Sequence, residues 1–403
     1  MKPILKTFLL LIITTQLVFS QQKLPVLKTN NTLISIKEGR SYYKDVWTIS
    51  PEVKLDIFVT NSFVGNKKIT FYSEIDSISF SVKPNKKYNF IISLNGKDKA
   101  YTQISTDNKQ KPTLAPKLIY TRRINTNQLT DTIPFTIGKD NRIHLQGNVN
   151  NSDSLDFLFD TGANACVITT SLINKKVAVN IDGSQENGST DGTSMVKTSS
   201  KNTISIGNLV WNDVPLLSID YKTASFDLIL GWVAFEDKII EIDYDKNILV
   251  VHRNLPSLNW EYSKLQMDFL DRGVPHINCK LITNGKTSNA MCTFDLGSNG
   301  NLLIGQQFAQ TNLLYDSLKI IGKTTSVGST GNKIVNDLVI LPKLKIGDYE
   351  MYQLPISIKQ KDPEGVSHNE NIGNNILKRF NTIIDFKNKF IYIKPNKLFY
   401  SPM

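Results

Sequence analysis

The feature that most constrains this chain is an internal repeat in its C-terminal two thirds. Five landmarks occur twice, in the same order and about 140 residues apart. The pairs are Phe159-Asp160-Thr161-Gly162 with Phe294-Asp295-Leu296-Gly297, Gly188-Ser189-Thr190 with Gly328-Ser329-Thr330, Ile206-Gly207 with Ile346-Gly347, Leu230-Gly231 with Ile372-Gly373, and Ile242-Asp243-Tyr244 with Ile384-Asp385-Phe386. Ordered recurrence at a nearly constant spacing indicates duplication. We therefore predict two lobes, over residues 118–254 and 255–403.

Each copy reads as a series of short strands that ends in a closing strand, Ile248 to Val251 in the first and Phe390 to Ile393 in the second. Many short β elements favour two small closed β units over a parallel α/β sheet. Residues 21–117 alternate apolar and polar side chains, as in Ile78, Phe80 and Val82. This period predicts a β-sandwich. It ends in a linker from Asn108 to Lys117, and its role is either binding or spacing.

The first twenty residues carry Lys2 and Lys6 before an apolar run, and they end in Val18-Phe19-Ser20. This is the pattern of a secretory signal peptide, with an uncleaved anchor as the alternative. We predict a secreted or periplasmic protein without stable membrane insertion after cleavage of residues 1–20. The formal charge of +11 is dispersed along the chain, which argues against a nucleic-acid partner.

The chain has three cysteines, Cys166, Cys279 and Cys292. A hairpin with a four-residue turn over Asn284-Gly285-Lys286-Thr287 puts Cys279 opposite Cys292. A disulfide bond between them is one interpretation, and two buried thiols are the other. The histidines are scattered and none has metal-ligand spacing with a cysteine, so we predict no metal and no cofactor.

The two Asp-x-Gly segments carry the candidate chemistry. A strand that runs into Asp and then Gly places a carboxylate at a sharp bend, and the match occurs at equivalent points of both copies. Two carboxylates that meet share one proton, so that the ionised one activates water and the protonated one donates to a carbonyl oxygen. We predict Asp160 and Asp295 as this catalytic pair.

These motifs resemble those of the pepsin and retropepsin-like aspartic proteases, particularly the bacterial retropepsin-like members. The resemblance covers about residues 130 to 396 and rests on the segments Leu158 to Ala163, Ile229-Leu230-Gly231, Phe294 to Ser298 and Ile372-Gly373. It implies an N-terminal β-sandwich followed by a two-lobed, aspartic-protease-like pair of β-barrels. It also implies a peptide or protein substrate and a monomer with a pseudo-dimer inside one chain.

Substrate would be bound beside the aspartates and under flap hairpins. The expected contacts in the first lobe are Thr161, Gly162, Gly188, Ser189 and Thr190. The expected contacts in the second lobe are Gly297, Ser298, Gly328, Ser329 and Thr330. The Gly-rich stretches Gly188 to Ser194 and Gly328 to Lys333 are either flaps or simple surface loops.

The second lobe departs from the family pattern. Leu296 replaces a Thr whose hydroxyl bonds across the lobe interface, and Asn371 stands where an apolar residue is expected. Ser298, three residues after Asp295, could donate its hydroxyl to that carboxylate and favour the ionised form. Replacement of Ser298 by Ala would then raise the lower apparent pKa of the pH-rate profile.

Three functions compete. The first is an exported aspartic endopeptidase, and the second is a catalytically impaired relative that binds peptides or proteins in the inter-lobe cleft. The third is a glycoside hydrolase, whose two carboxylates stand about 5 to 9.5 Å apart. Contact between the carboxyl groups would argue against the third.

Overall fold

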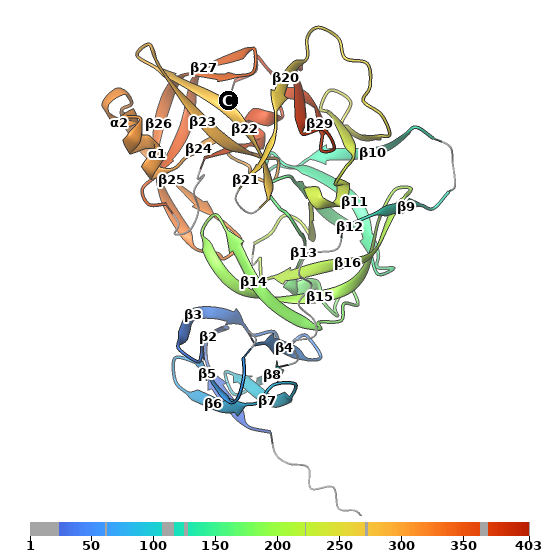
Figure 1. Ribbon diagram of the computed structural model, residues 1–403, viewed down its shortest axis with the longest axis vertical. Helices are drawn as coiled ribbons and strands as arrows, with labels where there is room; N and C mark the ends of the chain where they lie inside the picture. Colours follow the sequence, from blue (N-terminus) through green and yellow to red (C-terminus); the bar gives the residue numbers. More distant parts are fainter. Residues whose placement is uncertain are drawn as a thin grey trace, which may run out of the picture.

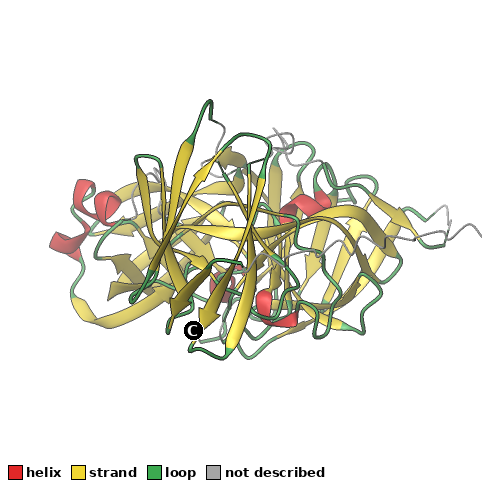
Figure 2. Ribbon diagram, turned by 90° about the horizontal axis from the view of Figure 1, so that it is seen from below, coloured by secondary structure: helices red, strands yellow, loops and turns green. Residues whose placement is uncertain are grey.

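The computed structural model describes residues 24–60, 63–106, 117–124, 128–221, 223–270, 273–362 and 370–402. The chain is mainly β, as predicted, with 58% of its residues in strands and 6% in helices, and it contains a closed six-stranded barrel (Figure 2). The predicted signal peptide and nearly all of the predicted linker lie outside the described residues. Within the described part of the chain, no helix has the length and apolar character needed to cross a membrane.

The N-terminal module is a sandwich of two four-stranded layers (Figure 1). One layer has the order β1-β7-β8-β4, and in the other β3 pairs with β2, β2 with β5, and β5 with β6. Alternate side chains of both layers meet in a separate core built around Trp47, Phe58, Phe71 and Phe90. The strands are β1 (Val26–Thr29), β2 (Leu33–Glu38), β3 (Ser41–Thr48), β4 (Asp56–Val59), β5 (Lys67–Tyr72), β6 (Ser77–Val82), β7 (Lys87–Leu94) and β8 (Asp98–Ser105).

The first lobe follows the module, and its strands and short 3-10 helices (η) form its part of the main core. The elements are β9 (Tyr120–Arg122), β10 (Thr130–Ile137), β11 (Ile143–Val149), β12 (Leu155–Asp160), β13 (Cys166–Thr169), η2 (Thr170–Leu172), β14 (Gly183–Ser189), β15 (Gly192–Ile206), β16 (Leu209–Ile219), β17 (Leu228–Gly231), η3 (Trp232–Phe235), β18 (Ile239–Asp243) and β19 (Ile248–His252). Within it, β12 pairs with β17 and β13 with β16, both in parallel.

The second lobe repeats this plan. Its elements are β20 (Ser263–Gln266), β21 (Asp268–Leu270), β22 (Val274–Thr283), β23 (Lys286–Asp295), β24 (Leu302–Ile304), α1 (Gln306–Thr311), α2 (Leu314–Ser317), β25 (Ile320–Val327), β26 (Lys333–Ile346), β27 (Tyr349–Lys359), β28 (Asn371–Gly373), α3 (Asn374–Leu377), β29 (Phe380–Asp385) and β30 (Phe390–Pro395). Here β23 pairs with β28 and β24 with β27, again in parallel. The pairings correspond to those of the first lobe, which accounts for the repeated landmarks.

One antiparallel sheet joins the lobes, in the strand order β10-β19-β18-β29-β30-β20. Strand β18 of the first lobe pairs directly with β29 of the second, from Ile239 opposite Asp385 to Ile242 opposite Thr382. The main core runs through both lobes without interruption. The lobes therefore share a sheet and a core. The predicted domain limits at residues 117 and 254 stay predictions.

The N-terminal module packs against the hairpin β14–β15 of the first lobe (Figure 1). Trp47 of β3 pairs with Met195 of β15, and the amide of Val59 donates to Ser184 Oγ at 2.8 Å. Lys197 of β15 forms a buried ion pair with Asp56, with Nζ and Oδ1 3.2 Å apart. Each buried charge needs an oppositely charged partner, because it has lost its contacts with water. The module is thus fixed to the strand that leads away from the tip of this hairpin.

The predicted register of the cysteine hairpin is wrong. Strands β22 and β23 are joined by the two-residue turn Asn284-Gly285, whose φ angles are +48° and +79°. Positive φ at both positions is the geometry that Asn-Gly favours in a tight hairpin. The shorter turn places Cys279 opposite Ala290 instead of Cys292. Both thiols are free and buried, in agreement with the alternative interpretation.

Candidate active site

The first candidate aspartate, Asp160, is the last residue of β12 and lies beside Gly231 of the parallel strand β17. The chain bends immediately after it, and the amide of Gly162 donates to Asp160 Oδ1 at 2.7 Å. A Cβ atom on Gly231 would lie 2.3 Å from the carbonyl oxygen of Ala165, so only glycine fits beside this bend. The local sequence therefore presents the carboxyl group at the end of a buried strand.

The second candidate, Asp295, occupies the equivalent position on the strands of the other lobe. It ends β23 and lies beside Gly373 of the parallel strand β28. The amides of Gly297 and Ser298 both donate to Asp295 Oδ1, each at 2.9 Å. Equivalent strands thus deliver one carboxyl group from each lobe.

The two carboxyl groups face each other so closely that, beyond the larger effect of burial, the negative charge of Asp295 raises the pKa of Asp160. Each glycine of the Asp-x-Gly bends lies against the carboxyl group of the opposite lobe. A Cβ atom on Gly162 would be 2.6 Å from Asp295 Cγ, and one on Gly297 would be 2.1 Å from Asp160 Cγ. Any side chain at either position would displace the opposing aspartate. The glycines are therefore required by the close approach of the two bends.

Burial and charge act on the protonation of this pair. Burial raises the pKa of Asp160 well above its usual range, and the negative charge of Asp295 raises it further, against the lowering effect of Arg142. Burial also raises the pKa of Asp295, against hydrogen bonds from Asn371, Asp160 and the neighbouring backbone amides. Two adjoining carboxyl groups share a proton because ionising both is costly. The pair can thus supply a base and an acid at once.

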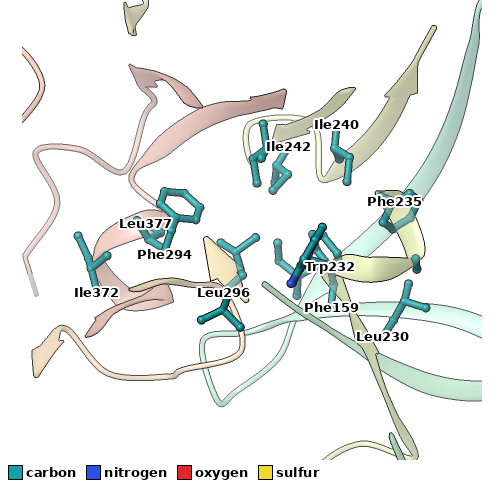
Figure 3. Packing of buried hydrophobic residues seen from close by; sticks show 14 of the residues in the cluster. Phe159, Leu230, Trp232, Phe235, Ile240, Ile242, Phe294, Leu296, Ile372 and Leu377 are labelled. Carbon is teal, nitrogen blue, oxygen red and sulfur yellow. The ribbon is translucent and has the colours of Figure 1, made fainter. Parts of the chain in front are cut away.

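The residues next to the two aspartates belong to one buried apolar cluster, part of which Figure 3 shows. Phe159 and Phe294, which precede the aspartates, and Leu230 and Ile372, which belong to the neighbouring strands, all are at most 1% exposed. Leu296 points into the same cluster and is itself 1% exposed. This packing excludes water from below the carboxyl groups, which strengthens their electrostatic coupling.

Thr161 connects the two bends from the first lobe. Its hydroxyl donates to the carbonyl oxygen of Phe294 and accepts the amide of Leu296, with 3.0 Å between nitrogen and oxygen. The position equivalent to Thr161 in the second lobe is Leu296, which has no hydroxyl and packs in the core instead. The hydroxyl contact across the lobe interface is therefore made by the first lobe alone.

The interpretation of Ser298 has to be corrected. Ser298 donates to Asp295 through its backbone amide, whereas the hydroxyl oxygen lies near Gly373 and is not among the donors to the carboxyl group. The side-chain donor is Asn371, whose Nδ2 donates to Asp295 Oδ2. The sequence signal at Asn371 was its break in an apolar pattern, which had indicated decay of the second lobe.

The predicted flap stretches are the tips of two hairpins, one in each lobe. Gly188 and Ser189 end β14, and Thr190 begins the turn into β15. In the second lobe, Gly328, Ser329 and Thr330 lie in the turn between β25 and β26. The tips contact one another directly, because Ser329 donates its amide to Ser189 Oγ at 2.8 Å. The two stretches are therefore parts of one bridging structure.

Asp191, which the sequence reasoning did not single out, holds this bridge together. Its carboxylate accepts backbone amides of Gly328 at 3.0 Å, Thr330 at 3.2 Å and Asn332 at 2.9 Å. The side chain is 7% exposed. An Asp between Thr and Gly is also an ordinary turn residue, so its place in the sequence does not indicate this contact. We call the set of contacts around Asp191 the tip latch.

Arg142 also escaped the sequence analysis. Its Nη1 donates to the carbonyl oxygen of Gly297 at 3.2 Å, across the lobe interface, and its charge acts on Asp160. Asp140 holds the guanidinium group in place, with Arg142 Nε and Asp140 Oδ2 2.8 Å apart. An isolated Arg in a strand-rich segment carries no motif, so only the fold brings it to the site.

No group of three His, Cys, Asp or Glu side chains that could hold a metal ion occurs in the described part of the chain. The two aspartates face each other and accept hydrogen bonds from amide groups, a set suited to proton transfer and poorly suited to a cation. Burial raises the pKa of the Cys166 thiol to about 12, which keeps it in the weakly nucleophilic thiol form. The candidate chemistry therefore rests on the two carboxyl groups.

The chain is similar to one protein-family model in sequence and, in fold, to solved structures that include an aspartic proteinase. Residues 145–233 match the family model described as aspartyl protease. A crystal structure of an aspartic proteinase from Irpex lacteus is similar over 68% of this chain and 99% of its own, with 12% identity and a TM-score of 0.45. No curated protein matches the chain. The family match includes Asp160 and Gly231 and ends before the second lobe, a shorter span than the predicted resemblance.

Proposed function

We propose that this chain, a member of the aspartic protease family by its match over residues 145–233, is an exported endopeptidase that hydrolyses peptide bonds in peptides or proteins. The observation that carries the proposal is the close approach of Asp160 and Asp295, each of which lies against the Asp-x-Gly glycine of the opposite lobe. The two groups arrive from equivalent strands, next to buried apolar residues of both lobes. This is the arrangement that activation of a single water molecule requires.

The reaction would proceed without a covalent intermediate. The ionised carboxylate accepts a proton from water as the water oxygen bonds to the scissile carbonyl carbon. The protonated carboxyl group gives its proton to the carbonyl oxygen, which takes up the electron pair of the C=O double bond. The carboxyl group that accepted the water proton then gives it to the amide nitrogen. The other carboxylate takes a proton from a hydroxyl of the tetrahedral intermediate as the C=O double bond re-forms and the C–N bond breaks. Both carboxyl groups end in their starting forms.

The two hairpin tips would cover the bound peptide. In this proposal Gly188, Ser189 and Thr190 in the first lobe, and the turn over residues 328–330 in the second, contact substrate from above, as Thr161, Gly162, Gly297 and Ser298 contact it from beside the carboxyl groups. The tip latch closes this cover, so peptide entry requires the contacts around Asp191 to open.

A second candidate is a peptide-binding protein that has lost turnover. Leu296 favours it, because the hydroxyl contact across the lobe interface is made from one side only. Weaker constraint on Asp295 would misplace the water by a distance that matters for catalysis. A glycoside hydrolase is disfavoured, because its carboxylates stand about 5 to 9.5 Å apart. The carboxyl groups of Asp160 and Asp295 face each other directly instead.

Export and oligomeric state belong to the same proposal. The signal peptide predicted at residues 1–20 would direct the chain to a secreted or periplasmic location, without stable membrane insertion after cleavage. The shared sheet between β18 and β29 supports a monomer that contains both aspartates. We propose no nucleic-acid partner and no cofactor.

The proposed activity can be tested with a mixed peptide library incubated with the purified mature chain from acidic to neutral pH. Cleavage products should appear with the native chain and be lost with Asp160→Asn. Asp153→Asn is the matched control, since Asp153 is exposed in the same lobe and should retain activity. Peptide binding without cleavage by the native chain would favour the second candidate. Equal cleavage by the native chain and Asp160→Asn would refute the proposed role of the pair.

A further inference from the structure

The two carboxyl groups do not have equivalent surroundings, although their strands are equivalent. Asn371, at the start of β28, is 9% exposed and donates its side-chain amide to Asp295 Oδ2. The corresponding residue of the first lobe is Ile229 of β17, because Gly373 and Gly231 lie opposite the two aspartates. One lobe thus offers a donor where the other offers an alkyl group.

The first-lobe position is packed among apolar side chains. Ile229 is 5% exposed and packs in a cluster with Leu158, Val167 and Leu217. It offers nothing that could hydrogen-bond to Asp160. The amide of Gly162 donates to Asp160 Oδ1, whereas Asp295 receives two backbone amides and one side-chain amide.

A donor count of this kind decides where a shared proton resides. An ionised carboxylate only accepts hydrogen bonds, whereas a protonated carboxyl group must also donate one. Donors from the protein therefore stabilise the ionised form of the group they contact. The amide of Asn371 favours the charge on Asp295 and leaves the proton on Asp160.

We infer that Asn371 is a positioning residue that keeps Asp295 as the ionised partner of the pair. If the proposed peptidase function holds, on which the catalytic part of this inference rests, Asp295 takes the proton from water and Asp160 protonates the carbonyl oxygen. The residue that looked like decay of the second lobe then sets the direction of proton transfer. The pKa of Asp160, which burial and the charge of Asp295 raise well above its usual range, is consistent with this assignment.

Other charged or titratable groups face the pair and are common to all variants considered. Arg142 acts on Asp160 from the first lobe. Burial raises the pKa of Tyr221, and the negative charges of Asp160 and Asp191 raise it further. Behind the strand of Asp295, His276 contacts Thr293, and Glu370 precedes Asn371 on the chain. None of these is altered by a substitution at residue 371.

The test is Asn371→Leu, which removes the donor and keeps nearly the same side-chain shape. Carboxyl ¹³C chemical shifts of labelled aspartates report the titration of the pair, and Asp160→Asn and Asp295→Asn assign the two signals. We expect the lower titration midpoint to rise by about one pH unit in Asn371→Leu, the effect of losing one hydrogen bond to a charged group. The midpoint of the acid limb in a plot of kcat/KM against pH should shift upward by the same number of pH units.

Asn289→Leu is the matched control, because Asn289 is an exposed residue of β23, the strand that ends in Asp295. Its titration curves should coincide with those of the native chain. If Asn371→Leu folds poorly, the NMR titration of Asn371→Ser, which removes the amide and retains a small polar side chain, provides the same comparison. Unchanged midpoints in a folded residue-371 variant would overturn the inference.

The outcome for this residue is separable from the outcome for the proposed function. Shifted carboxyl midpoints in a chain that cleaves no peptide would support the role of Asn371 and refute the peptidase proposal. A native chain that cleaves peptides with an acid limb indifferent to Asn371→Leu would support the peptidase proposal and refute the role of Asn371.

Discussion

Substitution of Asp191 should open the bridge between the two hairpin tips. The Asp191 carboxylate accepts three backbone amides from the other lobe and is 7% exposed. In Asp191→Asn the negative charge is lost. The new side-chain NH2 group cannot accept hydrogen bonds from the backbone N–H groups that face it. Hydrogen bonds to charged groups contribute roughly 1.5–3 kcal/mol each, and part of that is regained from water when the tips separate.

If one such hydrogen bond is not replaced, the free energy that favours the closed tips falls by roughly 2–3 kcal/mol. That corresponds to a decrease of about 30- to 150-fold in the ratio of closed to open tips. An opened cover binds peptide less tightly, so KM should rise more than kcat falls. The change in tip distance does not depend on catalysis and can be measured on its own.

Spin labels attached to cysteines introduced at Glu186 and Thr325, both exposed on the hairpins, report the distance between the tips. The three native cysteines are buried and free, which favours selective labelling at the new sites. The native chain should give one short distance, and Asp191→Asn should add a longer population. An unchanged distance distribution in Asp191→Asn would refute the latch, and Asp153→Asn should match the native chain.

Two further predictions concern stability. Burial, set against the charge of Lys197, raises the pKa of Asp56 to about 6, so the folded chain binds this proton more tightly than the unfolded chain does. The free energy of unfolding should therefore fall by about 3 kcal/mol as pH rises from about 3 to 7, and denaturant titrations of Asp56→Asn should lack this slope. An identical pH slope in the variant would contradict the role of Asp56. Thr161→Val should lower the free energy of unfolding by roughly 2 kcal/mol, because it leaves the buried amide of Leu296 without its acceptor. Thr161→Ser keeps the hydroxyl, so equal denaturation midpoints for the two variants would count against this contact.

Much of the architecture could be predicted from the sequence because it follows from repetition and alternation. The repeated landmarks fall on equivalent elements, and the closing strands predicted from Ile248 and Phe390 are β19 and β30. The error in the register of the cysteine hairpin comes from the length of its turn, since Asn-Gly favours the shorter form. Asn284-Gly285 forms a two-residue turn, and the two-residue difference moved the partner of Cys279 from Cys292 to Ala290.

The polar details of the site could not be predicted in the same way. Arg142, Asp191 and Asn371 act on groups more than 70 residues away in the sequence, through contacts that only the folded lobes create. Each residue type is common in the setting where it occurs. Asn371 was visible only as an exception to a pattern, and an exception does not reveal which atom it contacts.

Because both lobes belong to one polypeptide, the two halves of the site are encoded separately. In an assembly of two identical subunits, a substitution near one carboxyl group appears near the other as well, and the pair stays symmetric on average. Here Ile229 and Asn371 occupy matching positions with different side chains. Covalent linkage thus frees each half to specialise, one as proton donor and the other as proton acceptor.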